Sequence, residues 1–150
     1  MKIDRRHILK MAGGTAAAIT LVPINGYGDV PAMDKAIKDM FGSAPIREGR
    51  IKLSIPTLSE NGYSVDLKVE AESPMSDDDF VRQIAVFSER NPIPLIASYH
   101  FTPLSGRAEL SSKIRLGGTQ IVHAIAEMSD GSLWKTSTKV YVTLAACVTG

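Results

Sequence analysis

The residue in this chain with the most distinctive chemistry is its single cysteine, Cys147. It has no partner for an internal disulfide, so it is a free reactive thiol, one half of an intermolecular bridge, or a small apolar side chain at a strand end. No Lys, Arg or His lies between Lys139 and the last residue, and a terminal carboxylate would disfavour a thiolate. An enzyme lowers the pKa of its own nucleophile, so this pattern favours a thiol that other proteins load and unload.

Other chemistry-bearing residues are scattered. His100 and His123 are far apart in the sequence and have no Cys or carboxylate at metal-ligand spacing, so His123 is expected to be a strand histidine with a hydrogen-bonded ring. The aspartates at 77–79 lack the pattern of a calcium loop and are expected to cap a turn. Residues 117–119 lack the lysine of a phosphate loop, and no histidine or methionine follows Cys147 to complete a blue-copper site. We therefore predict no metal, no cofactor and no catalytic residues.

Residues 1–28 have the pattern of an export signal. Arg5 and Arg6 precede an apolar run over residues 11–22, which is too short to span a bilayer. Paired arginines before a weakly apolar, Gly- and Ala-rich run resemble a twin-arginine signal, although an amphipathic basic start that happens to hold two arginines is the alternative. The sequence predicts a mature protein that begins near Asp29, works in the periplasm and makes no membrane contact once the signal is removed.

Charge and compartment narrow the class of partner. The chain has 17 basic and 16 acidic residues, and no basic run lies beyond the first ten positions. This balance argues against nucleic acid and anionic membranes as partners. In an oxidising compartment, a cysteine left without a partner in its own chain is the residue most indicative of function.

The elements that would position this thiol begin with a short helix within residues 29–43. Gly42 is a stop signal, and apolar residues recur at three- and four-residue spacing: Met33, Ala36, Ile37, Met40 and Phe41. We expect this helix to pack its apolar stripe on the body of the domain.

From Arg50 onward the apolar period shifts to two, which is typical of strands. Alternating runs occur at residues 51–55 and 65–69 and are separated by a turn signal at 59–62, and further strands are expected at 80–87, 95–101, 108–116, 120–127 and 134–144. Asp130 and Gly131 predict a tight hairpin between the last two. About seven short strands predict an all-β, immunoglobulin-like antiparallel β-sandwich over residues 44–144, preceded by the helix.

Several segments, in order, resemble the SoxY family, the sulfur-carrier subunits of the thiosulfate-oxidising Sox system. They cover essentially the whole mature chain: residues 51–56 and 60–62, residues 84–87 with the Arg-Asn-Pro-Ile-Pro stretch at 90–94, residues 113–116 with 119–120, residues 126–131, and residues 142–144. The resemblance implies that Cys147 covalently holds thiosulfate-derived or sulfane sulfur. It also implies a chain that is a carrier and not an enzyme, and that binds no cofactor.

The resemblance further implies a set of partners. One is a SoxZ-like subunit, which forms a heterodimer with the carrier. The others are transient: a haem c enzyme that loads the sulfur, a hydrolase that releases sulfate, and an enzyme that oxidises the sulfane sulfur.

The carrier tail at residues 145–150 departs from the family pattern. That pattern is Gly-Gly-Cys-Gly-Gly, whereas this chain has Ala145 and Ala146 before the cysteine and Val148, Thr149 and Gly150 after it. Alanine and the β-branched valine restrict the backbone where glycines would rotate freely. We therefore expect restricted access for the usual Sox enzymes.

A non-catalytic interaction module, in which the cysteine is incidental or forms an intermolecular disulfide, is the alternative function.

Overall fold

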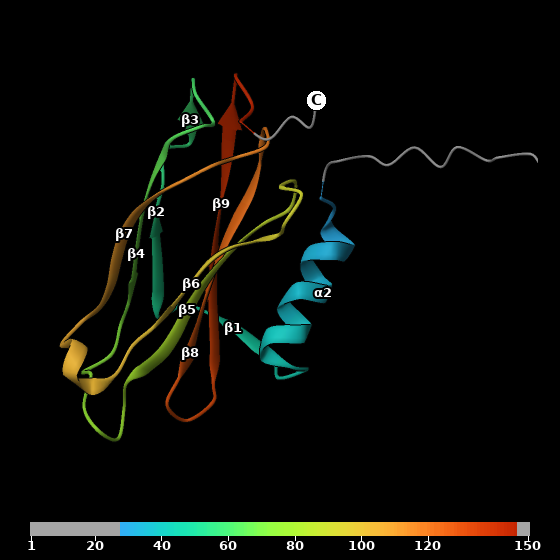
Figure 1. The fold of residues 1–150 in the computed structure, drawn as a ribbon. Helices are drawn as coiled ribbons and strands as arrows, with labels where there is room; N and C mark the ends of the chain where they lie inside the picture. Colours follow the sequence, from blue (N-terminus) through green and yellow to red (C-terminus); the bar gives the residue numbers. More distant parts are fainter. Residues whose placement is uncertain (1–27, 147–150) are drawn as a thin grey trace, which may run out of the picture.

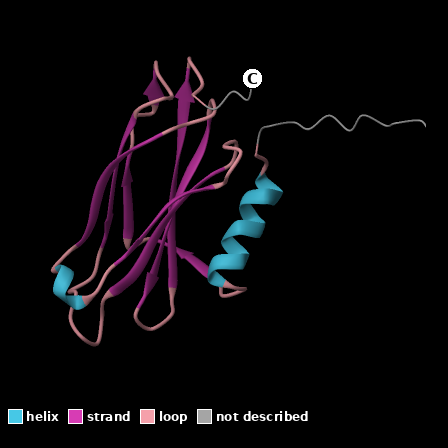
Figure 2. Ribbon diagram, viewed as in Figure 1, coloured by secondary structure: helices cyan, strands magenta, loops and turns pink. Residues whose placement is uncertain are grey.

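The computed structural model of the protein describes residues 28–146. The export-signal arginines Arg5 and Arg6, the cysteine Cys147, and Val148, Thr149 and Gly150 lie outside this range. Within it, one α-helix packs on a sandwich of two β-sheets, as Figures 1 and 2 show. The predicted fold class, a β-sandwich preceded by a short N-terminal helix, is confirmed.

The larger sheet has the order β1-β9-β8-β5-β6, and β3 also pairs with β9. Its strands are β1 (Ile46–Glu48), β3 (Leu58–Ser59), β5 (Val81–Ser88), β6 (Leu95–His100), β8 (Gln120–Met128) and β9 (Leu133–Val142). The smaller sheet has the order β2-β4-β7, with β2 (Ile51–Ser54), β4 (Val65–Ala71) and β7 (Ala108–Ile114). A 3-10 turn, η1 (Pro103–Ser105), lies between β6 and β7.

Two short strands were not predicted, and both pair in parallel with β9. β1 places Ile46 opposite Leu133, and β3 places Leu58 opposite Tyr141. All the other pairs are antiparallel. Segments of two or three residues are too short to show a period, so only the position of β9 beside them makes them strands. Pro56 follows β2, and the chain then crosses from the smaller sheet to the larger one.

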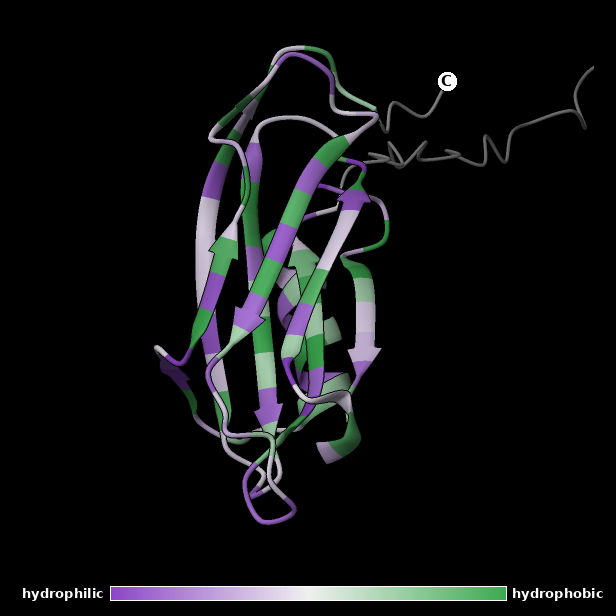
Figure 3. Cartoon of the chain, turned by 90° about the vertical axis from the view of Figure 1, so that its left-hand side faces the viewer, coloured by the Kyte–Doolittle hydropathy of each residue, from purple (hydrophilic) through white to green (hydrophobic). Residues whose placement is uncertain are grey.

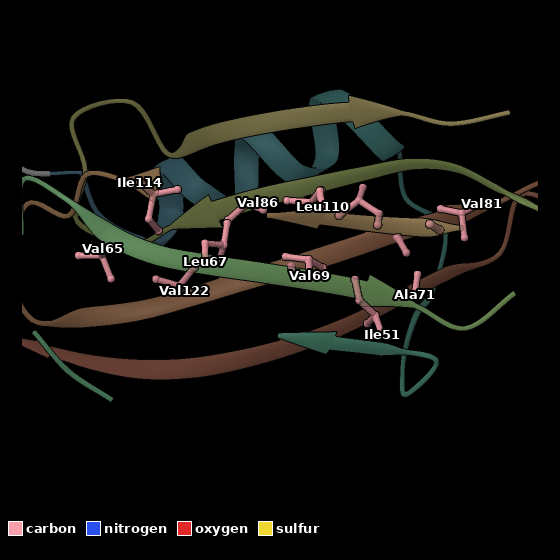
Figure 4. Close-up of a cluster of buried hydrophobic side chains, with 14 of the residues drawn as sticks. Ile51, Val65, Leu67, Val69, Ala71, Val81, Val86, Leu110, Ile114 and Val122 are labelled. Atoms are coloured by element: carbon pink, nitrogen blue, oxygen red, sulfur yellow. The ribbon is translucent and has the colours of Figure 1, made fainter. Parts of the chain in front are cut away.

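The core lies between the two sheets, and the period-two pattern decides which side chains enter it. Along β4, residues alternate strictly between buried and exposed, and Figure 3 shows this alternation on the smaller sheet. Val65, Leu67 and Val69 point inward toward residues of the larger sheet that include Val86 and Val122, as Figure 4 shows. Burial of this apolar surface is the main term that stabilises the sandwich.

The helix α2 (Val30–Phe41) covers the outer face of the larger sheet. Its N-cap is Asp29, whose Oδ1 accepts a hydrogen bond from the Ala32 N–H at 2.8 Å, and it ends before Gly42, whose φ is 73°. The helix buries Met33 against the sheet, and the ring of Phe41 meets that of Phe87 edge to face at 6.4 Å. None of the helical segments within residues 28–146 has the length and apolarity needed to cross a membrane.

The structure has a turn at both predicted places, between β8 and β9 and before β5. The Ser132 N–H donates to Asp130 Oδ1 at 2.8 Å, and Gly131 has a φ of 80° that favours glycine. Hydrogen bonds from Ser132 lower the pKa of the Asp130 carboxyl. Before β5, the Asp79 N–H donates to Ser76 Oγ at 3.2 Å, so the aspartates at 77–79 lie in a turn, but the side chain that caps it is a serine and not one of the predicted aspartates.

Replacing Phe87 by alanine should destabilise the protein strongly. Phe87 is fully buried where α2 meets the larger sheet, so the substitution removes apolar contacts and leaves a cavity. We expect the free energy of unfolding to fall by about 3–5 kcal/mol, measured by urea denaturation. Leu104, on η1, is 97% exposed, and Leu104→Ala should change the same quantity by less than about 0.5 kcal/mol. Equal effects of the two substitutions would contradict this packing.

Candidate functional site at the root of the C-terminal tail

The chain does not leave the sandwich where its last strand ends. After β9, the Thr143 N–H donates to the Ser59 carbonyl at 3.1 Å, and the Thr143 hydroxyl donates to the Glu60 carbonyl at 2.9 Å. Ala145 and Ala146 are half-buried, although Leu144 is exposed. We call Leu144, Ala145 and Ala146 the tail root, because Cys147 is the next residue in the sequence.

Gly62 brings three main-chain segments together at the tail root. Its N–H donates to the Leu144 carbonyl at 2.8 Å, and its carbonyl accepts from the Leu116 N–H at 2.9 Å. The Leu116 carbonyl in turn accepts from the Ala146 N–H at 3.0 Å. A Cβ at position 62 would lie 2.6 Å from the Leu116 oxygen and 2.9 Å from the Leu144 oxygen, so this close approach requires glycine.

A buried amide fixes the segment that holds Ala146. Asn91 Nδ2 donates to the Arg115 carbonyl at 2.8 Å, and Asn91 Oδ1 accepts from the Gly117 N–H at 2.8 Å. Gln120 Nε2 also donates to Asn91 Oδ1, and Gln120 Oε1 accepts from the Arg90 N–H at 2.9 Å. Asn91 and Gln120 are both buried, so these bonds form in a low dielectric where an unpaired group is costly. The Asn-Pro-Ile-Pro loop is therefore tied to the segment that carries Leu116.

The first described residue packs on the same loop. The Gly28 N–H donates to the Arg90 carbonyl at 3.3 Å, and a Cβ at position 28 would lie only 2.1 Å from the Asn91 carbonyl oxygen. Figure 1 shows the beginning of α2 and the end of β9 at the same end of the molecule. The start of the described chain and the tail root are thus tied to one loop system.

Tertiary structure brings a cation to this region that the linear sequence did not indicate. Arg90 Nη1 donates to the Thr119 carbonyl at 3.3 Å and lies against Gly118. Thr119 Oγ1 accepts from the Val142 N–H at 3.0 Å, which ties this turn to the end of β9. The segment after Lys139 has no basic residue of its own. Because of these contacts, however, the Arg90 guanidinium lies at the turn beside this segment. Only the pairing of distant loops could reveal this proximity.

The described histidines do not form a metal site. His123 Nε2 lies 3.4 Å from Glu89 Oε1, and both side chains are about one-fifth exposed, at 19% and 20%. This confirms the predicted strand histidine with a hydrogen-bonded ring. His100 is exposed on the edge strand β6. Within residues 28–146, no group of three or more His, Cys, Asp or Glu side chains is placed to hold a metal ion.

A groove of about 930 Å³ lies beside the smaller sheet where β2 ends. Its walls are mainly apolar, with Leu53, Ile55 and Pro56 on one side and Lys68 among the charged residues. Lys68 Nζ lies 2.9 Å from Glu109 Oε1; this hydrogen-bonded ion pair raises the pKa of Lys68 and lowers that of Glu109. The tail-root residues are not part of the groove lining, so the two features are separate.

The fold and the site define a class of protein: a small β-sandwich with a helix on its outer face and a C-terminal segment bound to the sandwich up to the residue before a cysteine. The family model described as sulfur oxidation protein SoxY matches residues 37–147. The chain belongs to the SoxY family, as the sequence resemblance predicted. The matched range includes Cys147.

Solved structures agree with this assignment. The chain is similar to the sulfur carrier protein SoxY from Chlorobium limicola, with 29% identity and a TM-score of 0.65 over 76% of this chain and 98% of that one. A superoxide reductase (neelaredoxin) from Ignicoccus hospitalis has 14% identity and a TM-score of 0.56, covering 63% of this chain and 80% of its own. The latter likeness concerns the fold alone. No curated protein sequence matches the chain significantly.

Asn91→Ala should destabilise the protein, because it leaves the part-buried Arg115 carbonyl and the buried Gly117 N–H without their partner. Each group left unpaired costs about 1–3 kcal/mol, so the free energy of unfolding in urea should fall by more than about 2 kcal/mol. Asn61 provides a matched control, since its Oδ1 accepts only a local, exposed hydrogen bond from the Tyr63 N–H at 2.9 Å. Asn61→Ala should cost less than about 1 kcal/mol. A smaller loss for Asn91→Ala than for Asn61→Ala would show that the amide does not fix this loop.

Proposed function

We propose that this protein is a sulfur carrier that holds thiosulfate-derived or sulfane sulfur covalently on Cys147 and presents it to partner enzymes. The observation that carries this proposal is the SoxY family match, which extends through residue 147. Likeness to a solved SoxY sulfur carrier at 29% identity supports it. The sequence holds a single cysteine, so the attachment point has one candidate.

The chemistry of loading requires an oxidant. The Cys147 sulfur forms a bond with the terminal sulfur of thiosulfate; the thiol proton goes to solvent, and the two electrons are accepted one at a time by the haem c enzyme and passed on to its electron acceptors. Water then cleaves the bond between the two sulfurs of the attached thiosulfate, releasing sulfate and leaving a persulfide on Cys147. In this scheme the carrier supplies only the sulfur atom that is modified.

The described part of the chain suits this passive role. Residues 28–146 contain no candidate metal cluster, and the buried polar groups Asn91 and Gln120 are engaged in structural hydrogen bonds. The thiol is thus presented by a folded body whose polar groups near the tail root hold main chain together. The catalytic groups are supplied by the partners.

The partners follow from the family. A SoxZ-like subunit forms a heterodimer with this chain, and a haem c enzyme, a sulfate-releasing hydrolase and a sulfane-oxidising enzyme act on the tail in turn. The apolar groove beside β2 and the edge strand β6 are surfaces on which the subunit could pack, because exposed strand edges accept further pairing. Each of the three enzymes is a transient partner.

The site of action is the periplasm, reached through the twin-arginine pathway. Arg5 and Arg6 before the short apolar run support this location. A twin-arginine route exports folded cargo, so the sandwich would form before transport.

Intact-mass measurement should detect sulfur on Cys147. Protein purified from cells growing on thiosulfate should show added masses of one sulfur atom or of a thiosulfonate group. Cys147→Ser should abolish these adducts, because a hydroxyl does not form the sulfur–sulfur bond. The substitution follows the last strand in the sequence and should leave the midpoint of urea denaturation unchanged.

Two results would contradict the proposal that Cys147 carries sulfur. A thiol that stays unmodified throughout growth on thiosulfate, with Cys147→Ser cells growing normally, would favour the interaction-module function. A mass equal to two joined chains would instead indicate that the cysteine forms an intermolecular disulfide.

Export should depend on guanidinium groups and not only on positive charge. Replacing both Arg5 and Arg6 by lysine preserves the charge, yet it should leave unprocessed precursor in the cytoplasm, as measured by cell fractionation and immunoblotting. Arg107→Lys, an exposed substitution in the body, serves as the control and should be exported normally. Unchanged export of the double lysine variant would show that residues 1–28 are not a twin-arginine signal.

A further inference from the structure

We infer that the tail root is an anchor, held by Gly62 and Asn91, that attaches the main chain to the sandwich up to the residue before Cys147 and so limits how far Cys147 can reach. This inference rests on the proposed function, since it concerns how far the loaded cysteine can reach. It assigns Gly62 and Asn91 as positioning residues and defines the kind of partner active site that the tail can enter.

Two main-chain hydrogen bonds, the ties of this anchor, attach the tail root to the sandwich at Leu144 and at Ala146. The Leu144 carbonyl accepts from the Gly62 N–H at 2.8 Å, and the Ala146 N–H donates to the Leu116 carbonyl at 3.0 Å. Ala145 and Ala146 are half-buried between these ties. The second tie falls on the residue that immediately precedes Cys147.

The two ties are themselves fixed. The Gly62 carbonyl accepts from the Leu116 N–H at 2.9 Å, so the two segments that hold the tail root also hold each other. Asn91 brackets Leu116 through hydrogen bonds to the Arg115 carbonyl and the Gly117 N–H, both at 2.8 Å. Leu116 is fully buried. The acceptor for Ala146 is therefore part of the core and not of a loose loop.

The anchor shortens the reach of the thiol. An extended chain spans at most about 3.5 Å per residue, so an arm that starts after Leu144 would place residue 147 up to about 10 Å from the sandwich. An arm that starts after Ala146 provides only about 3.5 Å. The difference of roughly 7 Å is enough to keep the sulfur out of a deep, narrow channel.

The partner enzymes that fit this tail have a specific geometry. Their reacting groups must lie near the surface, in an opening wide enough to receive the end of the sandwich. The rim of that opening would face the turn at residues 117–119, where the Arg90 guanidinium lies. An enzyme with a narrow channel would react only after the tail root detached.

Hydrogen exchange of the Ala146 amide, followed by NMR on the full-length protein, tests the anchor directly. In the native protein this amide should exchange at least about tenfold more slowly than in an unstructured peptide, because it is hydrogen-bonded to a core carbonyl. Gly62→Ala should bring the exchange rate to within about twofold of the peptide value, since the added Cβ would lie 2.6 Å from the Leu116 oxygen.

Gly131→Ala is the matched control. Gly131 has a positive φ, so alanine is strained there too, but a Cβ at that position has nothing within 4 Å. It should therefore affect stability without changing Ala146 exchange. Ala146→Pro removes the donor N–H at the last described residue and leaves Gly62 and Asn91 in place, so its thiol reactivity tests the anchor even if Gly62→Ala does not fold.

A second readout reports the reach of Cys147. In the native protein, a small maleimide such as N-ethylmaleimide should alkylate the thiol much faster than a maleimide attached by a short linker to a protein-sized carrier. Gly62→Ala and Ala146→Pro should lower this ratio of rates at least about fivefold, and Gly131→Ala should leave it unchanged.

An unprotected Ala146 amide in the native protein, or a rate ratio that neither anchor variant alters, would overturn the inference. Both readouts use purified protein and do not depend on sulfur metabolism. A protected amide combined with an absence of sulfur adducts in cells would overturn the proposed function and leave the anchor standing. The two failures are thus distinguishable.

Discussion

The close approach of three main-chain segments at Gly62 is the constraint on which the attachment of the described chain end to the sandwich depends. The segments of Leu116 and Leu144 both hydrogen-bond to Gly62, which leaves no room for a side chain there. Asn91 holds the same system from the other side through buried hydrogen bonds. The end of the last strand is consequently part of the sandwich up to the residue before the cysteine.

This arrangement separates the role of the scaffold from the role of the site. The same two-sheet fold occurs in superoxide reductases at 14–15% identity, so the fold does not define the chemistry. In this chain the buried amides of Asn91 and Gln120 hold main chain together, and the cysteine follows the last described residue in the sequence. A carrier needs such a division, because its cargo must reach the catalytic groups of other proteins.

In the structure, the two alanines before the cysteine lie against the sandwich. The sequence indicates only that Ala145 and Ala146 restrict the backbone more than glycines would. In the structure both side chains are half-buried on the body, and the Ala146 N–H is engaged. The departure from the glycine-rich family pattern is therefore accompanied by attachment of the tail root to the sandwich.

The sequence by itself determined the helix over α2, the seven longer strands, the hairpin at Asp130 and the family, because period and turn chemistry are local signals. Only the tertiary structure decided the rest. The short strands β1 and β3 exist because β9 lies beside them. The contacts of Asn91, Gly62 and Ala146 join segments 24 to 82 residues apart in the sequence, and no local pattern encodes such pairings.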